Sequence, residues 1–480
     1  MRRWLAAASG AKRVSRRRFL QAALPLAASP VLLHGAQPRV AIVGAGIAGL
    51  YAAWLLKQAG VEATIFESSK RSGGRMYSAT GTLAPGVTTE LGGEFIDTGH
   101  TEILRLAKRF GFELIDVEAP EEKALQSEAF LFGGMLRPEK EVHAAFAAVA
   151  PLLARDIAAA ARNAARYDRL SIAAYLDSIG VSGWLRALFD VAFQTEYGLE
   201  PGEQTAMNLL ALLTAEPDGT VTLFGESDER YKILGGNQRI PDALAGELTG
   251  QIRHEHRLEA LTHQDAGYRL SFENGREETA DAVLLTLPFT MLRRVTLRVP
   301  LPPAKRYAIH ELGYGTDAKL MFGVRRRLWR DAGYGGNLFS DEPFQLAWDS
   351  SRRQPSEAGG MTMLCGGRAG VAMGATDAER LVGQWMPSLE KAWKGIGAAR
   401  TGTAAMFHWP SHPHTLAAYT CYRPGQWTRI RGHEFRPVSR LHFAGEHTSL
   451  DFQGYMEGGA ETGKRAARAI LRQSGLPVPF

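Results

Sequence analysis

The stretch "PRVAIVGAGIAGLYAAWLLKQAGVEATIFES", residues 38–68, decides the fold. It opens with the short apolar run "RVAIV", which is typical of a buried parallel strand. A Gly-rich turn follows, and then a helix predicted over Ile47 to Gln58 that ends at Gly60. The next apolar run, "EATIF", predicts a second strand. The order strand, tight turn, helix, strand therefore predicts a βαβ unit with parallel strands.

The glycines of the turn have the spacing of a dinucleotide site. Gly44, Gly46 and Gly49 form G-x-G-x-x-G. The first permits the tight turn, the second lets backbone approach a pyrophosphate, and the third lets helix and strand pack closely. Glu67 stands eighteen residues after Gly49, where its carboxylate can accept hydrogen bonds from a ribose and disfavours NADP. A Gly-rich turn without a ligand explains the glycines but not this acid.

The first 36 residues carry a charge pattern that the rest of the chain lacks. Residues 1–36 hold seven Lys and Arg and no acid, whereas the remainder holds 49 Lys and Arg against 50 Asp and Glu. The formal charge of +6 therefore belongs to this segment, and we expect no nucleic-acid binding by the rest of the protein. Within it, "SRRRFLQ", residues 15–21, resembles the twin-arginine export signal and precedes an apolar stretch that ends near Leu33.

This segment predicts a signal peptide over residues 1–36. The twin-arginine translocation machinery carries folded proteins, which suits a chain that binds its cofactor before export. We expect the protein in the periplasm or outside the cell. It should be soluble after signal removal, because no later run reaches ~18 uninterrupted apolar residues. An ordinary secretory signal or a basic tail is the alternative.

The remaining chain predicts two interleaved domains. Residues 38–100, 235–300 and 430–475 are assigned to a cofactor-binding domain. Residues 101–234 and 301–429 are assigned to a substrate-binding domain with a helical part. Helical spacing is predicted over 101–186 and in a final helix over 454–472. Asn274-Gly275 predicts a hairpin turn, and the runs "AKLMFGV" and "MTMLCGG" predict strands.

Only two cysteines, Cys365 and Cys421, occur in the chain. They allow one disulfide but form no framework. Neither lies in a metal-ligand spacing, so no metal site is expected.

The residues after Glu67 indicate which dinucleotide binds. "ESSKRSGGR", residues 67–75, gives E-x3-R-x-G-G-R and resembles the FAD-dependent amine oxidase superfamily, which includes monoamine oxidases and L-amino-acid oxidases. The resemblance implies that Arg75 lies on the pyrophosphate, to which a guanidinium offers a planar fork. The next segment, "ELGGEFID", resembles the family segment beside the flavin ring and implies that Gly92 and Gly93 contact the cofactor.

The C-terminal stretch "RLHFAGEHTSLDFQGYMEGGAETGKRAARAIL", residues 440–471, resembles the same family. It implies that Glu446 bonds the ribityl chain and that the Met456 amide, at a helix N-terminus, faces the flavin C2 carbonyl. Leu258 is assigned to the same cofactor-binding set. The resemblance implies an α/β fold, in which a Rossmann-like FAD-binding domain is interleaved with a mixed-sheet substrate domain and a helical subdomain.

Two tyrosines are predicted to flank the substrate. "HWPSHPHTLAAY", residues 408–419, fits the family spacing W-x3-P-x3-G-x-Y with Ala in place of Gly. The resemblance assigns Tyr419 and Tyr455 to the aromatic pair that excludes water and orients a neutral amine. Ala418 stands where family members with covalent flavin have Cys, so FAD is expected to bind non-covalently.

Three charged residues are singled out near the expected flavin. Lys319 occupies the place of the lysine that holds a water at flavin N5 in relatives, and a lysine at a strand edge is the alternative. Glu94 is a candidate partner for a guanidinium or ammonium on the substrate, although a solvated loop acid fits equally well. For a substrate carboxylate only Arg423 comes into question, because no Arg follows "ELG".

These residues predict oxidative deamination of a primary amine. We expect hydride transfer from the α-carbon to flavin N5, followed by imine hydrolysis, with O₂ or a quinone as electron acceptor. Together with the twin-arginine leader, the segments "LGGEFID", "TEYGLEPGEQTAMNLL" and "GEHTSLDFQGYMEGG" resemble bacterial oxidases and dehydrogenases of basic L-amino acids. This resemblance favours L-arginine or L-lysine as substrate. A polyamine or monoamine oxidase is the near alternative, a carotenoid desaturase or protoporphyrinogen oxidase a more distant one, and a flavin-binding partner without turnover the last. The oligomeric state is open, with a homodimer among the options.

Overall fold

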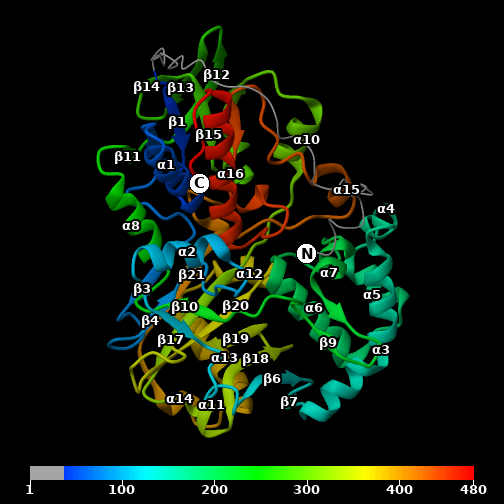
Figure 1. Ribbon diagram of the computed structural model, residues 1–480. Helices are drawn as coiled ribbons and strands as arrows, with labels where there is room; N and C mark the ends of the chain where they lie inside the picture. Colours follow the sequence, from blue (N-terminus) through cyan, green and yellow to red (C-terminus); the bar gives the residue numbers. More distant parts are fainter. Residues whose placement is uncertain (1–36) are drawn as a thin grey trace, which may run out of the picture.

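The computed structural model describes residues 37–480, so the predicted signal peptide lies outside the described residues. The predicted βαβ unit builds the centre of a parallel sheet (Figure 1). Its five strands are all parallel, in the order β11-β2-β1-β15-β22. Their bounds are β1 Val40–Val43, β2 Ala63–Phe66, β11 Ile252–Arg253, β15 Ala282–Leu285 and β22 Leu441–Phe443. All four residues of β1 and of β15 are buried, as expected for central strands.

Helices cover one face of this sheet. Helix α1, Ile47–Gln58, has the predicted bounds and packs along α16, Met456–Gln473, which begins two residues after the predicted start. Alternate residues of β1 face opposite layers, with Ile42 in the cluster beneath these helices and Val43 in the cluster on the other face. Helices α2 Thr101–Arg109 and α8 Arg239–Glu247 complete the helical layer. Full burial of one such apolar side chain contributes about 1.5–3 kcal/mol.

A small four-stranded sheet covers the other face, in the order β14-β13-β12-β16. Its strands are β12 Leu258–Gln264, β13 Gly267–Phe272, β14 Glu277–Ala280 and β16 Thr296–Arg298. The predicted hairpin is confirmed, because β13 pairs antiparallel with β14 and Gly275 adopts φ +77° in the turn. Helices α9 Phe289–Leu292 and α10 Pro303–Glu311 flank this sheet.

A seven-stranded mixed sheet lies below the parallel sheet in Figure 1, in the order β21-β17-β20-β19-β18-β6-β7. Only β18 and β6 pair in parallel. The strands are β6 Gln126–Phe132, β7 Met135–Leu136, β17 Ala318–Val324, β18 Tyr334–Ser340, β19 Leu346–Asp349, β20 Gly359–Cys365 and β21 Arg400–His408. Both runs predicted as strands are confirmed in β17 and β20. The helices α11 Leu328–Asp331, α12 Gly367–Met373, α13 Ala378–Ala392 and α14 Ile396–Ala399 accompany this sheet.

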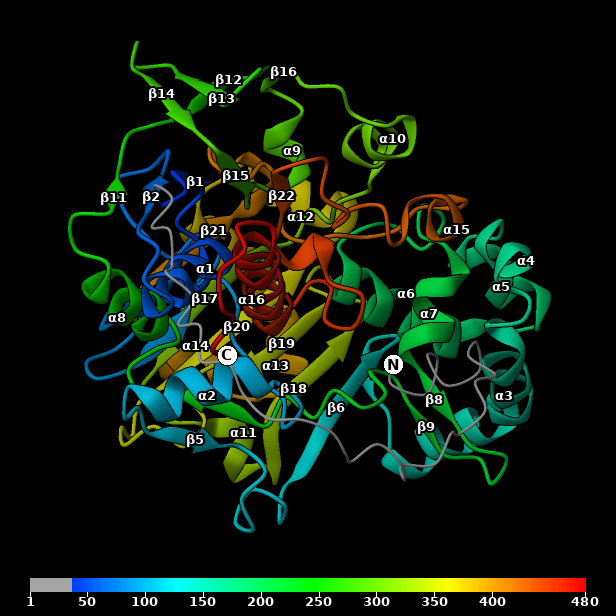
Figure 2. The same cartoon turned by 45° about the horizontal axis from the view of Figure 1, so that its top comes forward.

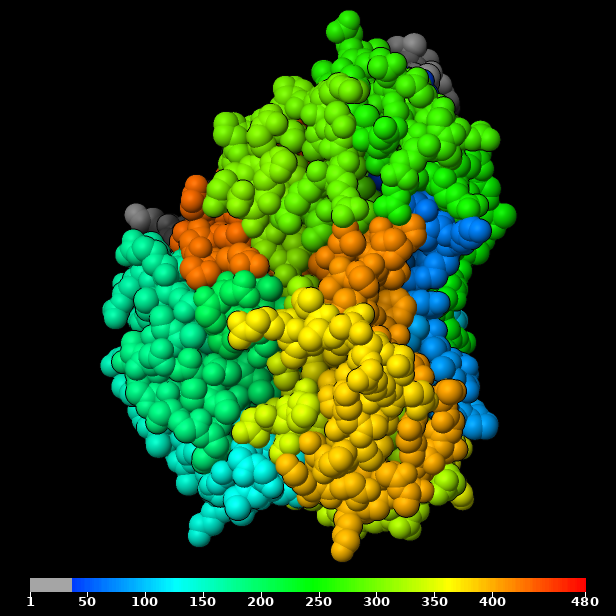
Figure 3. All heavy atoms as spheres, turned by 180° about the vertical axis from the view of Figure 1, so that it is seen from behind, coloured from blue at the N-terminus to red at the C-terminus, as the bar shows by residue number. Residues whose placement is uncertain are grey.

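A helical layer packs at the side of the mixed sheet (Figure 2), and Figure 3 shows it from behind as a continuous teal and green mass. It consists of α3 Glu139–Ala160, α4 Ala164–Asp168, α5 Ile172–Ser178, α6 Gly183–Tyr197 and α7 Ala206–Leu212. Among the described residues, α3 alone is long and apolar enough to cross a membrane, with a mean hydropathy of 1.4 over its most apolar window. Its Val142, Phe146 and Leu153 pack into the core of this layer.

The prediction of helical structure over 101–186 holds for α2 but is wrong for residues 110–138. After α2 the chain forms β5 Leu114–Asp116 and then the β6–β7 hairpin, which turns at Gly133 and Gly134 with φ of +64° and +75°. The short run "AFLF" there is too brief to separate a strand from a buried helix by periodicity. From 139 onward the helical prediction holds.

The two main sheets draw their strands from different parts of the chain. Every strand of the parallel sheet comes from the three ranges assigned to cofactor binding, and every strand of the seven-stranded sheet from the other two. Helices α2 and α10 pack into the clusters of the parallel sheet, although both lie within the other ranges. The domain boundaries stay a prediction. The remaining short elements are β3 Ser78–Thr80, β4 Thr88–Glu90, β8 Thr214–Ala215, β9 Val221–Thr222, β10 Tyr231–Ile233 and α15 Gln426–Ile430.

Candidate active site

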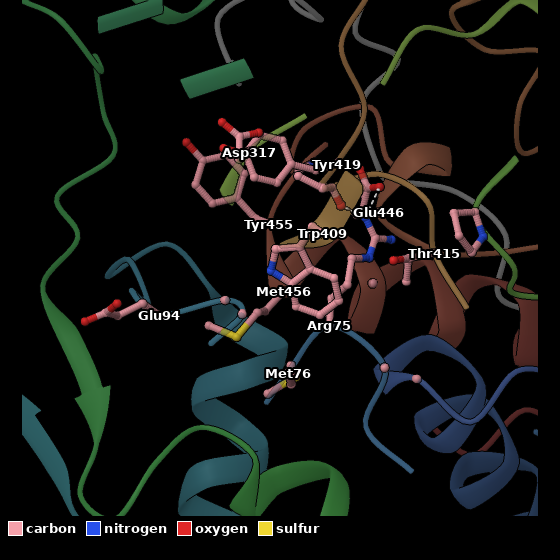
Figure 4. Close-up of a pocket in the computed structure, with 18 of the residues that line it drawn as sticks. Arg75, Met76, Glu94, Asp317, Trp409, Thr415, Tyr419, Glu446, Tyr455 and Met456 are labelled. Atoms are coloured by element: carbon pink, nitrogen blue, oxygen red, sulfur yellow. Dashed lines mark hydrogen bonds and ion pairs between the residues drawn. The ribbon is translucent and has the colours of Figure 1, made fainter. Parts of the chain in front are cut away.

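A cavity of about 360 Å³ runs from the carboxyl ends of β1 and β2 to the mixed sheet (Figure 4). One end, here called the cofactor end, is lined by the glycine loop and by Glu67, Arg75 and Glu446. The other, the substrate end, is lined by Tyr419 and Tyr455 and by residues of α6, β6 and β17. Such a crevice outside the carboxyl ends of parallel strands is where open α/β sheets bind ligands.

The three glycines of the fingerprint have distinct surroundings. Gly44 adopts φ +107°, and a Cβ there would lie 2.4 Å from Thr286 Oγ1. A Cβ on Gly49 would lie 2.0 Å from the Gly44 carbonyl oxygen, so this glycine lets helix and strand touch and does not line the cavity. Gly46 opens onto the cavity, because a Cβ there would meet nothing closer than the Gly74 Cα at 4.0 Å.

Glu67 is buried beside this loop. Its Oε2 accepts the Ala45 N–H at 2.8 Å, and its Oε1 accepts the Ser69 N–H at 2.8 Å. Ser68 Oγ also donates to Oε1, at 3.3 Å. A carboxylate has about four acceptor positions, so one remains for a ligand such as a ribose hydroxyl. The carboxylate therefore holds the glycine loop in place as well as lining the cavity.

Arg75 and Glu446 join the two ends of the chain across the cavity (Figure 4). Arg75 Nη1 donates to Glu446 Oε1 at 2.8 Å, and Glu446 Oε2 accepts the Gly454 N–H at 2.9 Å. Both side chains line the cavity, and the Glu446 side chain is only 6% exposed. This ion pair holds the loop before α16 against the segment after β2.

The start of α16 lines the middle of the cavity. Its first N–H groups have no intrahelical acceptor, so the end at Met456 presents a positive partial charge. The Met456 side chain lies on Gly93, where a Cβ would come within 2.8 Å of its Cγ. A Cβ on Gly92 would lie 1.8 Å from the Arg75 carbonyl oxygen. Both glycines are therefore required by packing and line the cavity.

The residues of the cofactor end fit FAD. A cradle at Gly46 that a Cβ would fill and the N-termini of α1 and α16 open onto the same cavity. Arg75 adds a guanidinium between them, and these are the groups that bind a pyrophosphate. Leu258 is the exception in the predicted set. Its side chain is buried in the core between the parallel sheet and the small sheet and does not line the cavity, so the structure does not support its assignment to the cofactor.

The two predicted tyrosines stand together at the substrate end (Figure 4). Tyr419 donates its hydroxyl to the Thr195 carbonyl at 2.9 Å, and Tyr455 donates to Glu196 Oε1 at 3.0 Å. Both hydroxyls are thus fixed by the last turn of α6. The rings form walls of the cavity and are rigidly held, as a pair that orients a substrate must be.

Lys319 lies on β17 and is buried, with its ammonium at the cavity wall. Nζ donates to three acceptors: the Glu90 carbonyl at 3.1 Å, the Gly92 carbonyl at 2.8 Å and Glu94 Oε2 at 3.1 Å. An ammonium has three donors, so none is left for a water. Its position at the cavity agrees with the prediction, but in this geometry it offers its charge rather than a held water.

The surroundings of Glu94 fit neither of its two predicted roles, the partner of a substrate cation or a solvated loop acid. Its carboxylate is buried between two ammonium groups, with Lys232 Nζ at 2.8 Å and Lys319 Nζ at 3.1 Å. Burial alone would raise the pKa of Glu94, but these two lysines outweigh it and lower the pKa below its usual range. The residue is not a solvated loop acid. Because two cations already neutralise it, the structure does not support Glu94 as the partner of a substrate cation.

The structure also places Arg423, the candidate partner of a substrate carboxylate, and the other acids near the substrate end. Arg423 pairs with Glu203 at 3.0 Å and does not line the cavity. Sequence analysis missed four acids that do line it, namely Glu128, Glu196, Glu229 and Asp317. Burial raises the pKa of Glu196 to about 7 despite the hydrogen bond from Tyr455. Of the four, only Glu196 lies in a segment whose resemblance to basic amino-acid oxidases gave a signal, "TEYGLEPGEQTAMNLL".

A sequence profile described as "Flavin containing amine oxidoreductase" matches residues 47–471. The chain belongs to this family. A flavin-containing amine oxidase of Oncorhynchus mykiss is 26% identical over 463 residues, covering 91% of this chain and 86% of the relative. An L-amino acid dehydrogenase of Synechocystis sp. is 26% identical over 460 residues, covering 90% and 94%.

Solved structures of amine oxidases share the fold. Putrescine oxidase with bound putrescine superposes with a TM-score of 0.78 at 19% identity, covering 91% of this chain and 99% of that one. Cyclohexylamine oxidase from Brevibacterium oxydans IH-35A gives 0.78 at 21% identity, covering 92% and 100%. The protein is therefore an FAD-dependent oxidoreductase acting on CH–NH₂ donors, with the predicted α/β fold.

Both cysteines are free and buried, so the disulfide that the sequence allowed does not form among the described residues. Cys421 is 1% exposed, lies near Asn208 Nδ2 at 3.4 Å and does not line the cavity. Ala418, at the place of the covalent link in some relatives, does line it. Non-covalent FAD follows from this arrangement and is consistent with the family. No cluster of three or more metal-ligating side chains occurs within residues 37–480.

A Lys319→Met variant tests the role of the buried ammonium. With O₂ as acceptor, we expect oxidation of the reduced enzyme to slow by about 10²-fold, the usual cost of removing one preorganised charge or donor. The rate constant is measured by mixing anaerobically reduced enzyme with aerated buffer. Lys232→Met is the matched control, because Lys232 also pairs with Glu94 but does not line the cavity. An unchanged rate in Lys319→Met would remove the assigned role.

Proposed function

We propose that this enzyme oxidatively deaminates a primary amine that carries a second positive charge. One observation carries the proposal. At the substrate end, the acids Glu128, Glu196, Glu229 and Asp317 line the cavity, while Lys319, the one lysine among the described residues that lines it, is already paired with Glu94. A cavity with this charge favours a dication over a neutral or anionic substrate.

The tyrosine pair supports the chemistry. Tyr419 and Tyr455 bound the slot, exclude water and direct the α-carbon of the bound amine, while Thr195 and Glu196 hold their hydroxyls. FAD, when bound, supplies the acceptor for the hydride that leaves this carbon. The amine binds neutral, so no protein base is assigned. Loss of hydride and one N–H proton gives an imine, and water converts it to an oxo product and ammonia.

Two classes of substrate carry the second positive charge that the acidic substrate end favours. A basic L-amino acid such as arginine or lysine is supported by the similarity to an L-amino acid dehydrogenase. A diamine or polyamine is supported by the cavity itself, because the arginines that line it, Arg71 and Arg75, both belong to the cofactor end. A substrate carboxylate thus meets no unpaired side-chain cation among the described residues. A binding partner without turnover is disfavoured by the intact tyrosine pair.

Anaerobic mixing of the purified protein with L-arginine, L-lysine, putrescine and phenylethylamine tests this proposal. Bleaching of the oxidised-flavin band near ~450 nm identifies the substrate class. We expect L-arginine, L-lysine or putrescine, each of which has two cationic groups, to bleach it faster than phenylethylamine. Bleaching by none of the four would contradict the proposal. Admitting air and measuring peroxide then separates O₂ from a quinone as the acceptor.

We also propose that the mature protein works in the periplasm or outside the cell. The support is the "SRRRFLQ" order and the confinement of the excess positive charge to residues 1–36. Replacing Arg16 and Arg17 together by Lys is expected to leave the protein in the cytoplasm with its FAD bound. Fractionation followed by the flavin spectrum measures this, and export that persists would contradict twin-arginine transport.

A further inference from the structure

The cavity continues beyond its substrate end. A second cavity of about 250 Å³ adjoins it and shares five lining residues with it: Phe95, Glu128, Phe224, Glu229 and Asn337. Two of these five are acids. The smaller cavity is lined further by Glu118 and Asp228, and Asp228 is exposed. Carboxylates therefore follow one another from the protein surface to the substrate end.

The two acids shared by both cavities, at what is here called the junction, have no ion-pair or hydrogen-bond partner for their carboxylates within residues 37–480. Glu128 comes from β6 and Glu229 from the loop before β10, and no described residue forms an ion pair with or donates a hydrogen bond to either carboxylate. Burial raises the pKa of Glu128 to about 7. Burial, together with the carboxylates of Glu196 and Asp97, raises the pKa of Glu229 to about 8. A cation placed between the two acids would relieve both penalties.

Glu229 is held in a strained backbone conformation by the contacts around it. It adopts φ +43°, an uncommon conformation for a residue with a side chain. The Asp97 carboxylate holds it there by accepting the Glu229 N–H at 2.9 Å and the Ser227 hydroxyl at 3.1 Å. Asp97 is itself buried. The structure thus uses a buried acid to aim a second acid at the cavity.

A further buried acid at the substrate end forms no ion pair within the part of the chain that the structure describes. Asp317 is 2% exposed and lines the same substrate end, and neither of its carboxyl oxygens has a hydrogen-bond partner among the described residues. The cations nearby are already paired. Lys232 and Lys319 bind Glu94, and Arg352, which lines the smaller cavity, donates to the Gly335 carbonyl and lies 3.7 Å from Glu122.

We infer that Glu128 and Glu229 form the subsite for the second cation of the substrate, and that the smaller cavity is the acidic passage through which the substrate arrives. This inference rests on the proposed function. It implies a substrate with a basic group at each end. Its reacting amine binds neutral between Tyr419 and Tyr455, while its distal ammonium or guanidinium reaches the residues that the two cavities share. Such a site selects by chain length, because a cation on a short spacer cannot reach both places.

Glu128→Gln and Glu229→Gln test the subsite. We expect the ratio of kcat/KM for putrescine or L-arginine to that for phenylethylamine to fall at least about 10-fold in each variant, since truncating one member of a buried charge pair costs that much or more. A second readout needs no turnover. The Kd of 1,4-diguanidinobutane, which has no primary amine, should rise by a similar factor in calorimetry with the FAD-loaded protein.

Glu226→Gln is the matched control. Glu226 is exposed, lies three residues from Glu229 and lines a different cavity, so both readouts should stay at the wild-type value. Ratios and Kd values that are unchanged in both junction variants overturn the inference while amine oxidation stands. Wild-type protein that bleaches with no amine contradicts the proposed function instead. Neither the ratio of kcat/KM values nor the Kd depends on the fraction of protein that folds, so a general loss of folding cannot imitate the expected outcome.

The passage also predicts a pH dependence. For an acid whose folded pKa is raised, the folded state holds its proton longer than the unfolded chain does. Stability is therefore highest below the ordinary pKa of 4.5, falls as the pH rises from there to about 7 to 8, and is level above. Ionisation also creates the charges that bind a dication. Thermal stabilisation by 1,4-diguanidinobutane is therefore expected to grow from pH 6 to pH 8.5, and this growth should shrink in Glu229→Gln. A stabilisation independent of pH in the wild-type protein contradicts the assignment.

Discussion

A Gly46→Val protein is expected to fold and to be colourless. Gly46 is the fingerprint glycine that opens onto the cavity, and a Cβ there would meet only the Gly74 Cα, at 4.0 Å. The protein therefore leaves room for a Cβ at this position, and the valine side chain fills the space where the pyrophosphate must approach the backbone. We expect FAD affinity to fall by about 100-fold, since overpacking costs up to about 3 kcal/mol.

The measurement is the ratio of flavin to protein absorbance after reconstitution with FAD, together with far-ultraviolet circular dichroism. Gly246→Val is the matched control, because Gly246 lies in α8 with no atom within 4 Å of its added Cβ. It should retain FAD. A yellow Gly46→Val protein would contradict the position assigned to the cofactor.

Removing Arg75 is expected to damage both FAD binding and stability. Its guanidinium lies 2.8 Å from the buried Glu446 carboxylate, and both side chains line the cavity. Arg75→Met would leave this carboxylate uncompensated, which costs about 3 kcal/mol or more. It would also remove the fork that the pyrophosphate requires. We expect a lower melting temperature of the apoprotein and loss of bound FAD.

The double variant Arg75→Met/Glu446→Leu separates these two effects. Removing both charges should restore much of the apoprotein stability, because no unpaired carboxylate remains, but it should not restore FAD binding. Arg39→Met is the control, since its ion pair with Asp281 lies at the surface and such pairs contribute about 1 kcal/mol or less. FAD binding in the double variant at the wild-type level would show that Arg75 does not hold the cofactor.

The local motifs could be predicted because the residues that form them lie close together in the sequence. The glycine loop, Glu67 and α1 lie within one βαβ unit, and the structure places each as the spacing requires. The tyrosine pair was found through resemblance alone, and the structure adds the fixed hydroxyls. The prediction for 110–138 failed because a short apolar run does not distinguish a buried strand from a helix.

The sequence alone could not predict which charged residues line the substrate end. Glu94 meets Lys232, 138 residues away, because an isolated bridge joins Ile96 to Tyr231. Glu128 reaches the cavity only because β6 pairs in parallel with β18. These contacts depend on long-range pairing, and no periodicity records them. For this reason the sequence singled out the one acid that is neutralised and missed the four that face the substrate end.

The central claim is that the tyrosine-walled cavity removes hydride from a carbon that bears an amine. The most direct test is an anaerobic single turnover of the FAD-loaded enzyme. It uses a saturating concentration of whichever of L-arginine, L-lysine, putrescine and phenylethylamine bleaches the flavin, and of the α-deuterated form of the same compound. The account predicts bleaching near ~450 nm that is several-fold slower with deuterium. Bleaching at equal rates with both forms, or no bleaching with any amine, would contradict it.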